Sequence, residues 1–494
     1  MFRDHQPLPL NQYNGLWKRG DADSCPSDHF SNCNNIDFVQ SGFRWRDGIN
    51  PYLAIPNVRR LYTFTQETGQ SLLVLDDNGN IFDTGQSITV PILTVTGMTD
   101  FAFVSISGRA FISPSNGVTG LEDEFIYVYE GDGTPARKAA GDPPVTADGA
   151  LAAANSATAG NVEAGVHIFA VVYETDTGFL SAPGPVGAFP TVTADGTKKV
   201  DLSAIPVSPS TTVVKRHILA TRAVYPPLYT GNTEGYEFFF VPDGEIADNT
   251  TTTLTVNFFD ADLIDSADDL FDLYSEIPAV VWLNTYHGRL VGGATFDDIS
   301  LTLVSNVGEP EAVNQIDGLL ITPLDGKPQT NGQEFRDVLY VFKQSRTFAF
   351  SDNGDVPSSW PLTVLDQGVG ASVHGIAFVL DSGGVNVDYL ITVDYSGVML
   401  FNGTFIRPEL SWKIHDLWIA LDRDFFKYIQ IINDTISQKL YVTLPERQML
   451  MLDYQNGLTP KDVRITPWSF DIEITTIALV NTNTLILGSL QEAA

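Results

Sequence analysis

The segment LLVLDDNGNIFDTG (Leu72 to Gly85) alternates apolar and other residues on both sides of an Asp-Asp-Asn-Gly reversal. Alternation with a period of two predicts β-strands, and Asn-Gly between two such runs predicts a tight hairpin turn. Hairpins repeated at roughly 35–50 residues, without helices between them, predict stacked antiparallel sheets and favour a β-propeller. Related phrases are EFIYVYEGDG (Glu124 to Gly133), VLYVFKQSRTFAFSDNG (Val338 to Gly354), YLITVDYSGVMLFNG (Tyr389 to Gly403) and KLYVTLPERQMLMLDY (Lys439 to Tyr454).

We expect about seven such modules, and therefore about seven blades. The last module is short, which makes the strand near Ile36 to Phe43 a candidate for completing the final blade. The modules are drawn at Val58 to Gly85, Gly97 to Gly133, 280–318, 319–352, 368–406, 424–455 and 465–490.

The hairpin pattern is interrupted between the second and third modules. Residues 136–160 are small, polar and marked by Pro and Gly, as in linkers. About 100 residues of short strands follow, which predicts an inserted sandwich of the immunoglobulin or fibronectin kind. Its strands are expected within Gly165 to Pro185 and at Lys199 to Leu202, Val213 to Thr221, Tyr236 to Val241 and Thr252 to Phe259.

An acidic helix is expected where the chain returns from the insertion. Leu263, Ala267, Leu270, Phe271 and Tyr274 recur at helical spacing, a capping box joins Ser266 to Asp269, and Pro278 ends the segment. The expected fold is thus mainly β, with four parts: an N-terminal arm with a possible closing strand (1–56), first propeller blades (57–137), the inserted sandwich with its bridging helix (138–278) and further propeller blades (279–494).

Composition restricts the possible partners. Asp and Glu number 60 against 28 Lys and Arg, which gives a formal charge of −32. This charge repels the phosphate backbone and disfavours a dedicated nucleic-acid-binding surface. No apolar run approaches the roughly 18 residues that a membrane helix needs, and the start MFRDHQPLPLNQYNG lacks the apolar core of a signal peptide. Two cysteines provide no disulfide framework. We therefore expect synthesis in the cytoplasm and no membrane partner.

Residues 1–56 are predicted to form an extended arm, because they are rich in Asn, Asp, Gly, Trp and Arg and are broken by prolines. The aromatic side chains of such an arm need a surface to bury against, either on their own chain or on a neighbouring subunit. Basic side chains next to these aromatic residues are unusual in so acidic a chain. They favour a contact with another subunit. The candidate interface residues are Trp17, Arg19, Phe43, Arg44, Trp45 and Arg46.

Four other motifs contain residue types that can carry chemistry, but none predicts a catalytic residue, a metal site or a cofactor site. Cys25, His29 and Cys33 have ligand chemistry but no second pair of ligands nearby. The acids Asp260, Asp262 and Asp265 miss the EF-hand spacing. GASVHG (370–375) lacks the second glycine of a nucleophile elbow, and SDNGDVPSSW (351–360) has the wrong offsets for a sialidase box.

Two phrases carry a resemblance to a known family: ETDTGFLSAPGP in the insertion, and YHGRLVGGATFDDISLTLVSNVGEPEAV (286–313) where the blades resume. With the arm and the order of parts, the chain resembles the propeller-type tail proteins of bacteriophages, in particular the nozzle proteins of short-tailed phages (tail tubular protein B type). The resemblance implies a non-enzymatic virion protein, made in the host cytoplasm, that forms a ring of six copies below portal and adaptor. It further implies contacts with the tail adaptor and with tail fibres or tip proteins. Double-stranded DNA would pass through the acidic channel without specific binding.

Two other functions fit the same fold expectation. A carbohydrate-binding or glycosidase-type propeller would have an open pocket with aromatic platforms and two close carboxylates. An interaction-hub propeller would carry Trp-Asp dipeptides, which this sequence lacks. A position in the tail of a longer-tailed phage is also compatible with the length of the chain.

Overall fold

The computed structural model is mainly β, with ten antiparallel sheets among the residues that it describes. Within the described ranges, two short α-helices, α1 (Asp268–Asp272) and α2 (His415–Ile419), and a few 3₁₀ turns lie between the strands. The described residues are 15–19, 25–26, 29–39, 42–46, 48–67, 69–140, 143–176, 178–210, 212–225, 235–272, 276–314, 317–322, 325–380, 388–445, 447–481 and 484–490.

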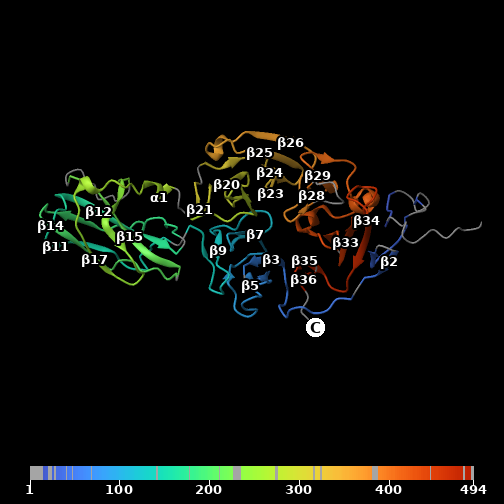
Figure 1. Ribbon diagram of the computed structural model, residues 1–494, viewed down its shortest axis with the longest axis horizontal. Coiled ribbons are helices and arrows are strands. Elements are labelled where there is room, and N and C mark those ends of the chain that lie inside the picture. The colour runs from blue at the N-terminus through green and yellow to red at the C-terminus, as the bar shows by residue number, and fades with distance from the viewer. Residues whose placement is uncertain are drawn as a thin grey trace, which may run out of the picture.

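Seven of the sheets form one body, here called the seven-sheet body, and follow one another along the chain (Figure 1). The first is β3–β6 (Arg60–Gln66, Gly69–Leu75, Asn80–Asp83, Leu93–Thr94) and the second is β7–β10 (Asp100–Ile106, Arg109–Ser115, Tyr127–Tyr129, Arg137–Lys138). The third is β18–β22 (Trp282–Tyr286, Arg289–Gly293, Leu301–Asn306, Glu309–Val313, Leu319–Leu320) and the fourth is β23–β26 (Gln329–Phe335, Val338–Lys343, Arg346–Phe350, Leu362–Asp366). The fifth is β27–β30 (Ile376–Val379, Tyr389–Asp394, Gly397–Phe401, Phe405–Ile406), the sixth is β31–β34 (Ile431–Asp434, Lys439–Leu444, Gln448–Asp453, Arg464–Ser469) and the seventh is β35–β36 (Ile474–Val480, Thr484–Ser489).

The first strands of neighbouring sheets pack against one another. Strand β7 contacts β3 and β18, β18 contacts β23, and β31 contacts β27 and β35. Between the fourth and fifth sheets, the Thr330 hydroxyl donates to the Ala371 carbonyl at 2.7 Å and the Asn331 amide donates to the Val373 carbonyl at 2.7 Å. The seven first strands therefore face a common centre.

The first and seventh sheets are also joined. The Leu61 backbone amide donates to the Thr476 hydroxyl at 3.1 Å, and the Thr63 hydroxyl donates to the Leu479 carbonyl at 2.6 Å. Strand β3 packs against β35, so the two ends of the series of sheets meet.

The candidate closing strand lies elsewhere than the sequence suggested. Strand β1 (Ile36–Val39) pairs with β2 (Gly42–Trp45) and lies beside β34 of the sixth sheet, not in the seventh. The Trp468 indole donates to the Ile36 carbonyl at 2.9 Å, and Phe38 is buried against the sixth sheet. These contacts hold the hairpin at the outer edge of the sixth sheet and leave the seventh with two strands.

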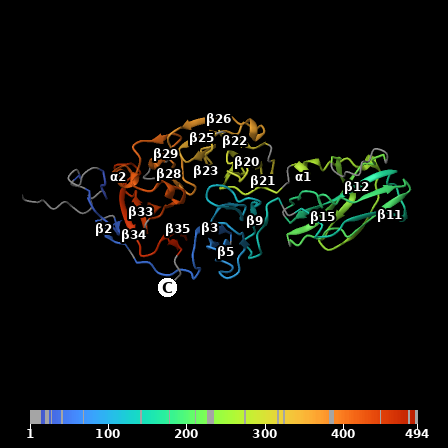
Figure 2. The same ribbon diagram turned by 180° about the vertical axis from the view of Figure 1, so that it is seen from behind.

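The remaining two sheets form the insert, which both views place at one end of the molecule (Figures 1 and 2). Side chains of both sheets share one apolar core that includes Phe169, Val171, Val200 and Leu202. The strands are β11 (Ala152–Ala159), β14 (Lys198–Ser203) and β17 (Thr253–Val256) in one sheet, and β13 (Thr191–Ala194), β12 (Gly165–Thr175), β15 (Val213–Thr221) and β16 (Phe238–Ile246) in the other.

A two-stranded neck joins the insert to the seven-sheet body. Ile126 lies between the leaving and the returning chain: its carbonyl accepts from the Ala139 amide at 2.7 Å, and its own amide donates to the Ile277 carbonyl at 2.8 Å. Across the neck, Lys138 and Glu276 form an ion pair at 2.8 Å. The chain therefore leaves and returns on either side of one residue.

The returning segment is less helical than the sequence indicated. It forms a 3₁₀ turn at Asp260–Asp262 and the short helix α1, while Tyr274 lies outside the described residues. The Ser266 hydroxyl accepts from the Asp268 amide and not from Asp269, so the expected capping box is wrong. The apolar positions instead pack against the insert, where Ala267 and Leu270 are buried beside Phe189 and Phe238.

Aspartate side chains close many of the turns. Asp76 accepts the backbone amides of Asn78 and Asn80, both at 2.8 Å, inside the Asp-Asp-Asn-Gly turn between β4 and β5. Carboxylates at turns mimic a backbone acceptor and satisfy amides that no strand can reach. The same arrangement recurs at Asp83, Asp132, Asp195, Asp248, Asp298, Asp325, Asp352, Asp366, Asp394, Asp434 and Asp453.

Candidate functional site

The first part of the arm packs on its own chain. The Trp17 ring lies edge-on to Trp412 with centroids 5.3 Å apart and to His29 at 5.2 Å. The guanidinium of Arg19, which is exposed, lies 5.2 Å from the centre of the Trp412 ring. Residues 1–14 of the arm lie outside the described part of the chain. Trp17 and Arg19 therefore attach the arm to the sixth-sheet end of the body.

The β1–β2 hairpin carries the other candidate interface residues. Arg44 donates to Asp37 of the same hairpin at 3.2 Å, and Arg46 stacks over Phe470, its guanidinium 4.6 Å from the ring centre. Trp45 is 77% exposed, whereas the side chain of Phe43 lies outside the described residues. Trp45 is thus the candidate that presents a large apolar surface to solvent.

A buried ion-pair group, here called the seam, joins the second and third sheets beside the neck. Glu311 is 2% exposed and accepts from both terminal nitrogens of Arg137, at 2.6 and 2.9 Å. It also accepts from Arg109 at 3.2 Å and from the Ala140 amide at 3.1 Å. Glu311 belongs to the GEPEAV segment on which the family resemblance was based. In the structure this segment stabilises the contact between the second and third sheets at the base of the insert.

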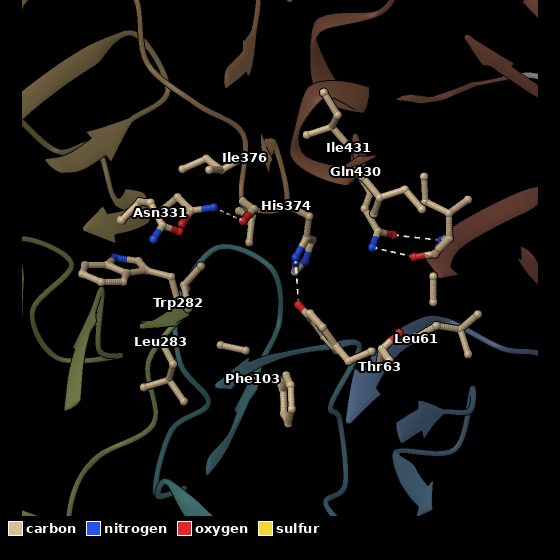
Figure 3. Close-up of a pocket in the computed structure, with 18 of the residues that line it drawn as sticks. Leu61, Thr63, Phe103, Trp282, Leu283, Asn331, His374, Ile376, Gln430 and Ile431 are labelled. Atoms are coloured by element: carbon tan, nitrogen blue, oxygen red, sulfur yellow. Dashed lines mark hydrogen bonds between the residues drawn. The ribbon is translucent and has the colours of Figure 1, made fainter. Parts of the chain in front are cut away.

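The first strands of the seven sheets surround a central cavity of about 370 Å³ (Figure 3). Its walls include Leu61, Phe103, Trp282, Ile376 and Ile431, with polar groups between them. None of the described residues that line it is Asp or Glu. The lining is therefore mixed in polarity and carries no carboxylate pair.

A hydrogen-bonded chain of four side chains reaches this cavity through Tyr62 and His374, whereas its other two members lie behind the lining. Arg60 donates to Asp100 twice, from Nε at 2.8 Å and from Nη2 at 3.0 Å. The Nε2 atom of His374 lies 2.7 Å from the Asp100 carboxylate, and its Nδ1 atom lies 2.9 Å from the Tyr62 hydroxyl. The hydroxyl also lies 3.1 Å from the Phe101 carbonyl.

Burial shapes the protonation of this group. Burial lowers the pKa of His374, and Arg60 lowers it further, against the opposing effect of Asp100. Burial alone would raise the pKa of Asp100, but Arg60 and His374 outweigh it and hold that pKa well below its usual range. Burial and the Asp100 charge both raise the pKa of Tyr62. At neutral pH the group therefore contains a charged Arg60–Asp100 pair, a neutral imidazole and a neutral phenol.

A smaller cavity of about 170 Å³ lies next to the central one and is lined partly by Ser372 and Asp394. Burial raises the pKa of Asp394 to about 6. Its carboxylate accepts the Gly370 amide at 2.9 Å and the Ser396 amide at 2.7 Å. Asp394 is thus engaged in a turn, as the other turn aspartates are.

The residues of the cysteine–histidine motif and of GASVHG do not converge on a common site. Each makes contacts with other parts of the fold. Burial raises the pKa of Cys33 to about 11, and its thiol contacts the Thr466 hydroxyl. Cys25 contacts the backbone carbonyl of His29. The Ser372 hydroxyl donates to the Ile429 carbonyl at 3.2 Å, while His374 faces Tyr62 and Asp100.

One group of possible metal ligands occurs among the described residues: His287, Glu334 and Asp337, whose ligand atoms lie within 4.8 Å of one another. Asp337 is 93% exposed, and the His287 ring stacks on Tyr286 with centroids 4.2 Å apart. Exposed acids close to a histidine are frequent without an ion, so these three side chains do not by themselves indicate a metal site. Within the described ranges, no helix has the length and apolar character needed to cross a membrane.

Comparison with known proteins finds no matching family model and no matching curated protein. Among solved structures, the chain is similar to PorZ, a bacterial surface component of the type-IX secretion system of Porphyromonas gingivalis, with 12% identity and a TM-score of 0.35. That match covers 90% of this chain, which spans only 37% of the length of PorZ. Apo AztD from Citrobacter koseri matches with 11% identity and a TM-score of 0.32, over 88% of this chain and 90% of AztD.

Proposed function

We propose that the seven-sheet body is a closed, seven-bladed β-propeller and that the insert is a sandwich of the immunoglobulin or fibronectin kind. The successive packing of first strands and the bonds between β3 and β35 support closure. The insert has two sheets of three and four strands around one core, which suits a sandwich of that size. The domain boundaries expected from the sequence, at 1–56, 57–137, 138–278 and 279–494, are part of this proposal.

We further propose that the protein is a structural component of a phage tail, a nozzle subunit that assembles into a ring. The observation that carries this proposal is the placement of the β1–β2 hairpin and the insert at opposite ends of the molecule (Figures 1 and 2). A ring of identical copies uses head-to-tail contacts, which need two different surfaces on each copy. Exposed Trp45 supplies an apolar contact at one end.

In this proposal the DNA channel lies between copies and not through a single body. The central cavity holds about 370 Å³ and is crossed by side chains, whereas the major groove of duplex DNA alone is about 12 Å wide. A ring of copies with a charge of −32 each would present an acidic surface that lets DNA slide past without gripping it. Adaptor, fibres or tip proteins would bind the faces of the ring and the insert.

The test is assembly of the purified protein with a candidate portal and adaptor from the same genome, followed by mass photometry and electron microscopy. We expect six-fold rings, and we expect Trp45→Ala to reduce ring formation while leaving the melting temperature unchanged. Val90→Ala, which changes an exposed apolar side chain (62% exposed) between β5 and β6 of the first sheet, is the matched control and should leave ring formation unchanged. Release of sugar from host polysaccharide, with no ring under any condition, would instead favour the carbohydrate-active alternative.

A further inference from the structure

The buried chain of four side chains joins three sheets beside the central cavity, and two of its members, Tyr62 and His374, line that cavity. Arg60 and Tyr62 belong to the first sheet and Asp100 to the second, whereas His374 directly precedes the fifth. Along the series of packed first strands, the sixth and seventh sheets separate the fifth from the first, and the third and fourth separate it from the second. His374 therefore reaches across the cavity to sheets that its own strand does not adjoin.

We propose that Arg60, Asp100, His374 and Tyr62 form a pH-sensitive brace, which holds the first, second and fifth sheets together while His374 is neutral and weakens when His374 binds a proton. The proposal does not depend on assembly into a ring. It assigns a conformational role to the centre of the seven-sheet body, where the lining offers no catalytic carboxylate pair.

The hydrogen-bond geometry gives the neutral imidazole one consistent arrangement. Its Nε2–H donates to Asp100, and its unprotonated Nδ1 accepts from the Tyr62 hydroxyl. A proton on Nδ1 turns that nitrogen into a donor to the Tyr62 oxygen, and the hydroxyl then donates its own proton to the Phe101 carbonyl, 3.1 Å away. The contact between the first and fifth sheets therefore keeps its hydrogen bond with the donor reversed, and the cost of protonation lies in the positive charge that it adds to a buried group.

The charges around the imidazole oppose a second buried cation. Arg60 of β3 and Asp100 of β7 are the charged groups that act on it, and Tyr62 of β3 is the other titratable group in contact. The segment before β31 adds only neutral Gln430, which sits beside the backbone of His374. Asp100 is already paired with Arg60, so a proton on His374 places two positive charges around one carboxylate.

The sign of the pH dependence follows from linkage. Burial and Arg60 hold the pKa of His374 in the folded protein below its ordinary value of about 6.5. The unfolded chain therefore binds the proton first. The stabilisation from the brace is complete above about pH 6.5 and is lost as the pH falls through the folded pKa.

The experiment compares thermal unfolding of the wild type and His374→Gln between about pH 7.5 and about pH 5. Tryptophan fluorescence reports on the seven-sheet body and the arm alone, because all seven tryptophans lie outside the insert. The wild type should melt several degrees higher than the variant at pH 7.5, and at least half of that gap should disappear at pH 5. His217→Gln, which removes another histidine–carboxylate contact (2.6 Å to Glu174) within the insert, is the matched control and should show a gap near zero at every pH.

A second measurement follows the His374 imidazole in the wild type by NMR, with the signal assigned by its shift in Tyr62→Phe. If His374→Gln does not fold, this measurement alone tests whether the pKa of His374 is lowered in the folded protein. A titration midpoint below about 6.5 supports the brace. A midpoint at or above that value, or a melting gap that stays constant with pH, overturns it.

Discussion

Substitution of Glu311 by glutamine should destabilise the seven-sheet body strongly, because it removes the charge that balances Arg137 and Arg109 in the seam. Glu311 is 2% exposed and Arg137 donates to it twice. Breaking a buried ion pair by removing one partner costs about 3–5 kcal/mol, since the other charge stays buried without compensation. Glu130 remains 3.8 Å from Arg137 and offsets part of this loss. We therefore expect about 3 kcal/mol, at the lower end of the range.

The assay is urea unfolding followed by tryptophan fluorescence, which excludes the insert from the signal. The matched control is Asp77→Asn, which breaks a pair with Arg59 at the surface, where the two side chains are 41% and 33% exposed. That variant should lose less than about 1 kcal/mol. A double-mutant cycle of Glu311→Gln with Arg137→Met should show coupling of at least about 1 kcal/mol. Equal losses in Glu311→Gln and Asp77→Asn, or no coupling in the cycle, would refute the reasoning.

Three further outcomes are expected. Asp394→Asn should become more stable relative to the wild type as the pH rises from about 4 to about 6. The folded pKa of Asp394 is raised to about 6, so the unfolded wild-type chain loses its proton first and folding of the wild type weakens over this range. A stability difference between the two proteins that stays constant with pH would contradict this. Residues 145–272, expressed alone, should unfold cooperatively by circular dichroism, since both apolar clusters of the insert lie within them, and a melt without a transition would argue against an independent unit. Trp17→Ala should lower the melting temperature while Trp45→Ala leaves it unchanged, because only the first ring is packed on Trp412; equal shifts in scanning fluorimetry would be inconsistent with that packing.

Local patterns predicted the strands well where turn chemistry marks the reversals. The Asp-Asp-Asn-Gly turn lies between β4 and β5 as predicted, and the strand β15 has the predicted bounds Val213–Thr221. The prediction was wrong for β34, which was assigned to the last module, because RITPWS carries Pro467 and shows weak alternation. It also missed β10, since two paired residues leave no periodicity.

The brace and the seam could not be predicted, because their members are remote in the sequence. Tyr62 and His374 are 312 residues apart, and Glu311 and Arg137 are 174 apart. His374 was considered from the sequence only as a neighbour of Ser372. The segment that contains Glu311 did stand out in the sequence, because it contributed to the family resemblance. It gave no indication that Glu311 binds two arginines.

Because both connections of the insert pass through the neck, the insert could be replaced by another domain. The outgoing and incoming chains flank Ile126 and are pinned there by backbone bonds and by the Lys138–Glu276 pair. Any module whose two ends emerge side by side could be spliced at this point without altering the order in which the other sheets meet. Recombination between related genes could therefore exchange this outer module while the seven-sheet body is inherited unchanged.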